Sequence, residues 1–333
     1  MLATLALGAT AACSREPVPT ANPPTANPPT TSATSTSATS TSPSTTPPAT
    51  TSKARLVVLS PGLAVILRDM SLGDRIVARH AYDSATTQAI PAAGDEAGID
   101  EEVLLRVAPT AVLLQQSARP ISQRLLDSAQ SRGFEILTVP MLSLEDIPKA
   151  TRAMDALIAR LEGTSPTNND PASATSKLLR EMDRAWTPRT THSNQPQRVL
   201  LLISVDPPAA LGPGSWHHDM LVRLGGTPAI TQGSPYIELD TESLLRLAPD
   251  AIVLITTELR SQSEISPALV PIANADLDQA LVRARLASLA KLNIPAFINS
   301  KLAAIDDPLS LTPSSAMIPF ADRLRAILIA WQK

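Results

Sequence analysis

The chain has 333 residues, a formal net charge of −3 and only 2% aromatic residues, and its length allows two domains with sizeable cores. No Lys/Arg-rich run or basic stripe occurs in the sequence. Nucleic-acid binding requires such a charge pattern, so this class of protein is disfavoured. Because aromatic side chains are so few, the cores must be packed with Ala, Leu, Ile and Val, and an aromatic residue in a loop stands out.

Residues 1–13 have the pattern of a lipoprotein signal peptide. The apolar run LATLALGATAA precedes Cys13, the only cysteine of the chain, and it is too short for a bilayer, which takes roughly 20 residues. It suits the h-region of a signal peptide, and the Ala-Ala-Cys ending resembles a bacterial lipobox, which implies that Cys13 is acylated. No Lys or Arg precedes the run, so either the true start lies upstream or the signal is atypical. The alternative is a buried N-terminal helix with an incidental cysteine.

Residues 14–53 are expected to form a disordered tether. From Pro17 to Ser52 the chain is uncharged and consists almost wholly of Pro, Thr, Ser, Ala and Asn, with TANPP and TSATS repeated. Such a segment has too little apolar surface to offset the entropy of ordering it. Roughly 40 residues of flexible chain span about 35 Å root-mean-square, which would let a folded body move near a membrane.

Residues 54–142 are predicted to form a first α/β lobe. The run RLVVLS at Arg55 predicts a strand, PG a turn, and LAVILRDM a helix. In SLGDRIV the glycine closes that helix and the aliphatic residues begin the next strand. The lobe continues to the strand FEILTVP.

Two helices are predicted to follow within residues 143–190 and to join two lobes. They are LEDIPKATRAMDALIARLEG and ATSKLLREMDRAW, separated by the breaker TSPTNNDP. A second lobe, residues 191–333, opens with RVLLLISV at Arg198, which mirrors RLVVLS. It ends in the amphipathic helix PFADRLRAILIAWQ.

A nearly repeated stretch predicts that the two lobes are alike. GIDEEVLLRVAP begins at Gly98 and ELDTESLLRLAPD begins at Glu238, with Asp, Glu, Leu-Leu-Arg and Ala-Pro in one register. Each copy indicates an Asp N-cap, a short helix, a proline stop and a buried strand. A helix that leads into such a strand is half of a βαβ unit, so we expect two Rossmann-like α/β lobes, each with a parallel sheet.

From Arg55 to the C-terminus, this order of elements resembles the iron-siderophore, haem and vitamin B12 substrate-binding proteins of ABC importers. The resemblance rests on RLVVLSPG, SLGDRIV, EEVLLRVAP, GPGSWHHDMLVRLGG and ELDTESLLRLAPDAIVL. It implies two α/β lobes joined by a rigid helical backbone, with a ligand cleft between them. It also implies a lipid-anchored monomer on the periplasmic side of a bacterial membrane that delivers its ligand to a permease.

The resemblance also implies a role for one acid in each repeat. Glu102 and Glu242 match the surface glutamates that dock onto arginines of the permease in this family. The alternative is that each acid only complements the dipole of its own helix, worth about 0.3 to 1 kcal/mol.

Ligand-contacting residues are expected in loops that follow strands, because ligands of α/β lobes bind beyond the carboxyl ends of the strands. Ser60 could hold an anion beside free helix amides or simply cap the helix. The loop RHAYD offers His80, Tyr82 and Asp83, where the family places a ligand-contacting tyrosine. In QQSARP, Gln115 matches a position that is often aromatic in the B12-binding relatives, and the nearby Arg119 could meet a carboxylate or lie in solvent.

In the second lobe, GPGSWHHD places Trp216 and His217 at the start of a helix that Ser215 caps. The helix dipole disfavours the imidazolium, so the histidine should stay neutral and free to contact a ligand. Trp216 offers rigid apolar area to a flat macrocycle or is a partly buried core residue. Tyr236 matches a cleft tryptophan of the B12-binding relatives.

These residues favour a receptor for a metal chelate. A corrinoid is favoured over a ferric siderophore because the predicted cleft has no arginine cluster for a strongly anionic complex. Haem is the alternative ligand, with Tyr82 or His80 and His217 as axial ligands. A protein that keeps the fold but only signals or acts as a scaffold is the alternative of another class.

Two further classes are disfavoured by missing motifs. A free-metal site needs three or four converging ligands, and the chain has only four histidines. The sequence has no Gly-x-Ser-x-Gly elbow, phosphate loop or HExxH motif, so we expect no enzyme and no cofactor of its own.

Overall fold

A computed structural model of the protein describes residues 52–95, 98–188, 197–257 and 279–332. The predicted signal peptide with Cys13 and nearly all of the predicted tether lie outside the described residues. Within the described ranges, no helix is both long and apolar enough to span a membrane.

The first sheet is parallel except at one edge. Its strand order is β4-β3-β2-β1-β5-β6, and only β4 runs antiparallel to its neighbour. The central strand β1 (Leu56–Val58) is completely buried, as expected for a parallel sheet with both faces covered. The other elements are α1 (Pro61–Asp69), η1 (Gly73–Arg75), β2 (Ile76–His80), β3 (Ala92–Asp95), β4 (Gly98–Ile99), α2 (Glu101–Val107), β5 (Ala111–Gln115), α3 (Gln123–Arg132) and β6 (Glu135–Val139).

The second sheet is mixed, whereas the sequence predicted a parallel one. The strands β7, β9, β11 and β12 are parallel, but β8 lies antiparallel between β7 and β10. Only two residues separate β7 from β8, which suffices for a hairpin but not for a parallel crossover. Its elements are β7 (Arg198–Val205), β8 (Pro208–Leu211), α6 (Trp216–Arg223), β9 (Thr227–Pro228), β10 (Tyr236–Glu238), α7 (Thr241–Leu247), β11 (Ala251–Thr256), α8 (Gln279–Arg285), α9 (Pro295–Ile298) and β12 (Leu302–Asp306).

The two repeat helices begin and end alike, as the sequence predicted. Asp100 accepts a hydrogen bond from the amide of Val103 at the start of α2, and Asp240 accepts one from Ser243 at the start of α7. Both helices end at an alanine with left-handed backbone, φ 43° at Ala108 and 40° at Ala248. The proline that follows prevents either helix from continuing.

The likeness extends to the strand that opens each half of the chain. Arg55 donates from Nη2 to the carbonyl of Val107 at 2.6 Å, and Arg198 donates in the same way to Leu247 at 2.6 Å. Each guanidinium therefore satisfies a carbonyl at the end of its repeat helix, where a cation also complements the helix dipole. We infer that the sequence repeat marks a repeated structural unit.

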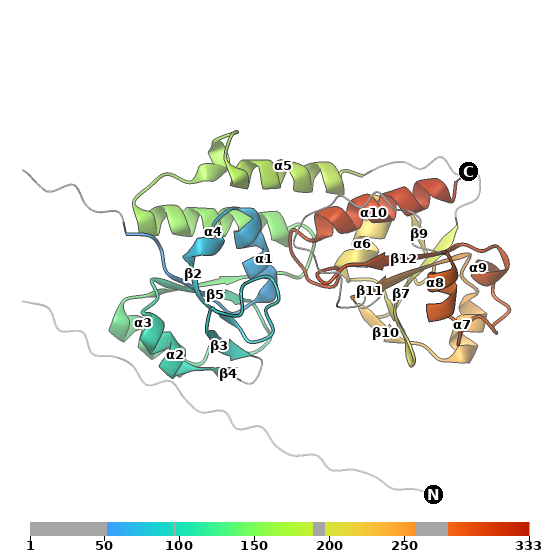
Figure 1. Ribbon diagram of the computed structural model, residues 1–333, viewed down its shortest axis with the longest axis horizontal. Helices are drawn as coiled ribbons and strands as arrows, with labels where there is room; N and C mark the ends of the chain where they lie inside the picture. Colours follow the sequence, from blue (N-terminus) through green and yellow to red (C-terminus); the bar gives the residue numbers. More distant parts are fainter. Residues whose placement is uncertain (1–51, 96–97, 189–196, 258–278, 333) are drawn as a thin grey trace, which may run out of the picture. The chain divides into compact units, whose positions relative to one another are not determined.

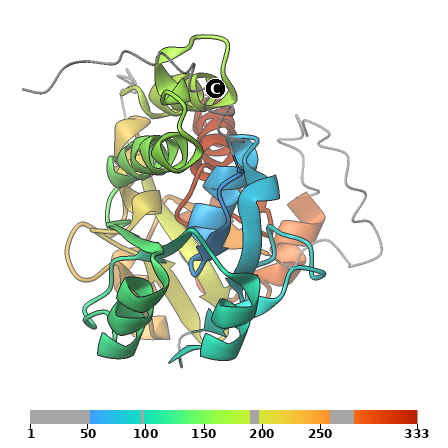
Figure 2. The same ribbon diagram turned by 90° about the vertical axis from the view of Figure 1, so that its left-hand side faces the viewer.

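Three helices lie on one side of the two sheets. They are α4 (Asp146–Glu162), α5 (Ala174–Trp186) and α10 (Met317–Ala330), with the short η2 (Thr167–Asn169) in the predicted breaker between α4 and α5. Of these helices, α4 contacts the strand β6 and α10 contacts the strand β12. Figures 1 and 2 show α4 and α5 side by side, with α10 next to α5. Arg184 of α5 pairs with Asp322 of α10. The division into two lobes joined by residues 143–190 stays a prediction.

One of the hydrophobic clusters contains side chains from both sheets. A single cluster of buried side chains includes Leu56 of β1, Met154 of α4, Met182 of α5, Val199 of β7 and Phe320 of α10. Side chains that pack in one cluster transmit strain between the elements that carry them. The two halves therefore share a core through the helices rather than meeting across a bare linker.

Candidate ligand site

Three of the predicted residues lie at the carboxyl edge of the first sheet. Ser60 follows β1, His80 ends β2 and Gln115 ends β5, and β1 pairs in parallel with both β2 and β5. The Ser60 hydroxyl donates to Oε1 of Gln115 at 3.4 Å. Ser60 is buried and holds the N-cap position of α1 without a side-chain cap bond. Its hydroxyl thus links two loops of this edge.

The loop after β2 displays one aromatic ring and encloses an acid. Tyr82 is 74% exposed, and its ring centroid lies 5.7 Å from that of His80. Asp83 is only 1% exposed. Its carboxylate accepts from the Ala85 amide at 2.7 Å and from the Thr86 hydroxyl at 2.6 Å. Asp83, which was predicted to contact the ligand, is therefore held inside the turn that carries Tyr82.

The candidates of the second sheet lie on two neighbouring segments. Ser215 caps α6 as predicted, accepting from the amide of His218 at 3.2 Å. The turn before it approaches β10, since Gly212 donates to the carbonyl of Pro235 at 3.1 Å. Tyr236, the first residue of β10, is 51% exposed. Trp216 is partly buried and packs against the main core, so Tyr236 is the more accessible ring.

His217 was predicted to contact the ligand, but the structure buries it. Its side chain is 2% exposed, its Nε2 lies 2.6 Å from the carbonyl oxygen of Ser310, and its ring meets Phe320 edge-on at 4.8 Å. A carbonyl only accepts, so Nε2 carries the hydrogen. Burial lowers the pKa of His217 to about 4. The imidazole is neutral as predicted, but burial is the cause, and the ring is closed to an iron atom.

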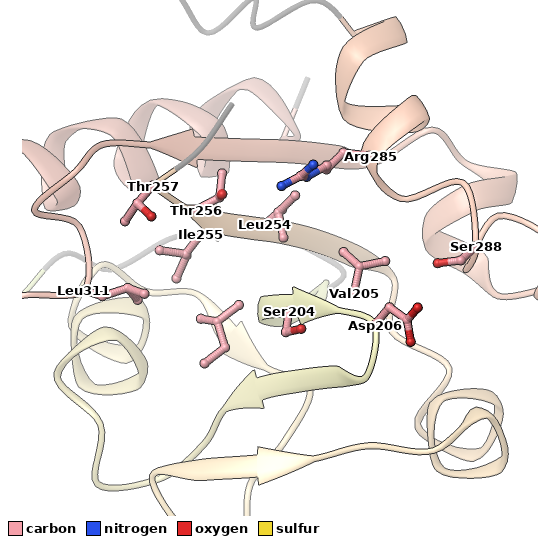
Figure 3. Close-up of a pocket in the computed structure, with 11 residues that line it drawn as sticks. Ser204, Val205, Asp206, Leu254, Ile255, Thr256, Thr257, Arg285, Ser288 and Leu311 are labelled. Atoms are coloured by element: carbon pink, nitrogen blue, oxygen red, sulfur yellow. The ribbon is translucent and has the colours of Figure 1, made fainter. Parts of the chain in front are cut away.

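A cavity that was not predicted from the sequence opens at the carboxyl ends of β7 and β11 (Figure 3). Its volume is about 570 Å³. Figure 3 shows Arg285 on one wall and Asp206 on another. The strand rule that selected four other loops also applies to the ends of β7 and β11. The cavity is lined by Ile203, Ser204, Val205, Asp206, Leu254, Ile255, Thr256, Thr257, Arg285, Ser288 and Leu311.

The two predicted docking acids are exposed on equivalent helices. Glu102 lies in the first turn of α2 and Glu242 in the first turn of α7. The Glu242 side chain is 86% exposed and lies 3.6 Å from Arg246 one turn on. Figures 1 and 2 show α2 and α7 on the side of the molecule opposite α5 and α10.

Among the described residues, no three His, Cys, Asp or Glu side chains converge as a metal site would require. The surface does carry two exposed tyrosines, Tyr82 and Tyr236, and the mixed polar wall of the cavity. Such surfaces suit an organic ligand held by ring contacts and hydrogen bonds.

Comparisons with known proteins give structural matches only. No family model matches the sequence, and no curated protein matches it. A periplasmic vitamin B12-binding protein, BtuF of Vibrio cholerae, is 19% identical, with a TM-score of 0.59 and coverage of 84% of this chain and 98% of that one.

Two other solved structures match similarly. The periplasmic haem-binding protein HutB of Vibrio cholerae is 17% identical, with a TM-score of 0.57 and coverage of 83% and 99%. A possible iron-binding periplasmic solute-binding protein from Staphylococcus epidermidis is 18% identical, with a TM-score of 0.56 and coverage of 83% and 98%. The chain therefore has the two-lobed α/β fold of periplasmic substrate-binding proteins, as its sequence predicted.

Proposed function

We propose that this protein is a lipid-anchored receptor that binds a metal chelate, a corrinoid or a ferric siderophore, and delivers it to an ABC importer permease. The observation that carries the proposal is the fold, which matches binding proteins for vitamin B12, haem and iron over more than four-fifths of the chain. The receptor acts as a monomer on the periplasmic side of the membrane, held by acylated Cys13, and catalyses no reaction.

The chemistry of the exposed groups supports a neutral, ring-containing ligand. Tyr82 and Tyr236 offer aromatic faces, and the cavity wall carries both a cation, Arg285, and an anion, Asp206, beside hydroxyl groups. A ligand with several carboxylates would bring like charge against Asp206, at a cost. Amide groups both donate and accept, so this wall favours a corrinoid, whose side chains end in amides, over a polycarboxylate chelate.

Haem is the second candidate because Tyr82 presents an exposed phenol, a group that can bind haem iron. The two ligands are separated by replacing Tyr82 with phenylalanine and with alanine. A corrinoid needs only the ring face, so Tyr82→Phe should keep cyanocobalamin affinity and Tyr82→Ala should weaken it by about tenfold.

Haem ligated by the phenol oxygen should instead lose its shifted Soret band in Tyr82→Phe. Tyr236→Phe is the matched control, because it removes a phenol oxygen from the other half of the chain. If cyanocobalamin, hemin and ferric siderophores all fail to bind the unchanged protein, the receptor proposal is wrong and the scaffold alternative gains support.

We also propose that Glu102 and Glu242 dock the receptor onto the permease. Reversing both charges, Glu102→Lys with Glu242→Lys, should reduce uptake of the bound chelate at least tenfold in cells while leaving chelate affinity unchanged. Each side chain is exposed, so the reversal should cost stability only through the helix dipole, about 1 kcal/mol or less.

The matched control reverses two exposed acids elsewhere, Asp127 of α3 and Asp183 of α5, with the same change in net charge. Normal uptake by the Glu102/Glu242 variant would contradict docking and would mean that these acids only complement the dipoles of their own helices. Equal loss in the control variant would indicate a general effect of charge instead of docking.

A further inference from the structure

One guanidinium ties together both ends of the loop that follows β2. Arg79 is buried and donates from Nη1 to the carbonyls of His80 at 2.9 Å and Ala81 at 3.0 Å. Its Nε donates to the carbonyl of Ile90 at 3.1 Å, and its Nη2 to the side-chain oxygen of Gln88. The first two acceptors begin the loop and the last two end it.

The partners of Arg79 are neutral. Within the described part of the chain, no carboxylate lies within ion-pair distance of it; the nearest acid in sequence, Asp83, is bonded to Ala85 and Thr86. Burying a cation without an anion is costly. Only a guanidinium offers five donors in a fixed plane that can serve four such acceptors together. The four hydrogen bonds to the loop therefore offset part of the cost of burying the Arg79 cation.

The segment held in this way carries the exposed ring pair. The amide of Tyr82 donates to Nδ1 of His80 at 3.2 Å, and the two rings are tilted by 49° at 5.7 Å. Tyr82 has few contacts of its own to fix its position, since it is 74% exposed. The backbone that Arg79 fixes thus sets where this ring stands.

We propose that Arg79 is a positioning residue that holds the ring pair of His80 and Tyr82 ready for the ligand. The proposal rests on the proposed function, because it assumes that this loop contacts the chelate. Arg79 itself touches no ligand: its guanidinium is turned into the loop. Pre-ordering the loop spares the ligand the entropic cost of fixing it on binding.

The test uses the fact that the chain has only two tyrosines, Tyr82 and Tyr236. The full chain is labelled with ¹³C in its tyrosine rings, and Tyr82→Phe assigns the two resonances. In Arg79→Met, which keeps the apolar stem and removes every donor, the Tyr82 resonance should shift or broaden while the Tyr236 resonance stays. Cyanocobalamin affinity should fall about tenfold or more, and Arg79→Lys should restore only part of it because its ammonium reaches fewer acceptors.

Arg152→Met is the matched control, since Arg152 is exposed on α4 and donates to the carbonyl of Pro148 in its own helix; it should change neither resonance. If Arg79→Met does not fold, Gln88→Met removes one of the four acceptors and should move the Tyr82 resonance alone. An unchanged Tyr82 resonance, or equal changes at both tyrosines, overturns the proposal. If the unchanged protein binds no chelate, the proposed function fails, while the resonances still decide whether Arg79 orders the loop.

Discussion

Replacing Gly62 with alanine should lower the free energy of unfolding by about 2 kcal/mol, although alanine is the better helix former. A Cβ atom at Gly62 would lie 2.4 Å from the carbonyl oxygen of Pro313, and overpacking of this kind costs roughly 1 to 3 kcal/mol. Helix propensity alone would give a gain of about 0.5 to 1 kcal/mol. A lower free energy of unfolding for the alanine variant, measured by urea unfolding, would therefore show that the backbone is closely packed at Gly62.

This contact joins the two halves of the chain. Gly62 lies in α1, beside the first sheet. Pro313 lies in the loop that connects β12 of the second sheet to α10. The same loop donates from the Ser315 hydroxyl to the carboxylate of Asp69 at 2.6 Å. The matched control is Gly73→Ala, whose nearest atom would be 3.6 Å away; its stability should change by less than about 0.5 kcal/mol. Equal stability of the two variants would mean that the halves do not meet tightly here.

Acidification should destabilise the protein through His217 before its carboxyl groups titrate. The pKa of His217 falls from 6.5 in the unfolded chain to about 4 in the fold, because burial disfavours the charged ring. The stability that the neutral ring contributes to the fold is fully present above pH 6.5 and is lost as the pH falls toward 4. At about 1.4 kcal/mol per pKa unit, the loss is about 3 kcal/mol. Urea unfolding at a series of pH values measures it.

His217→Gln separates this effect from those of the acids. Glutamine keeps an N–H that can donate to the Ser310 carbonyl but does not titrate, so the slope between pH 6.5 and 4 should flatten. The salt-bridged acid Asp74 has its pKa lowered to about 2, chiefly by the hydrogen bond from Arg75. Its contribution is present above pH 3.8 and is lost below that. A slope unchanged by His217→Gln would show that this ring is not the titrating group.

The features that the sequence predicted well are those with local causes. The repeat helices follow from an Asp cap and an Ala-Pro stop within a few residues, and both ends were found. The partners of Arg55 and Arg198 lie about 50 residues away in sequence, so no local pattern could predict these hydrogen bonds. The strands β8 and β10 were missed because PAAL and YIE are too short to carry an alternating pattern.

Some of the predicted site residues are exposed and others are buried, and the sequence pattern did not distinguish them. Tyr82 and Asp83 are neighbours, yet one ring is exposed and one carboxylate is buried, because the turn directs adjacent side chains to opposite sides. Trp216 and His217 begin one helix, but the core covers the histidine almost completely. The cavity at β7 and β11 depends on how two strands and α8 come together, which sequence spacing alone does not give.

Native mass spectrometry of the full chain with an equimolar mixture of cyanocobalamin, cobinamide, hemin and ferric siderophores tests the receptor proposal most directly. One chelate should add to the protein in a one-to-one complex, while ferric and cobalt ions added to a separate sample should not bind. An absence of adducts, or equal retention of a bare metal ion, would contradict it.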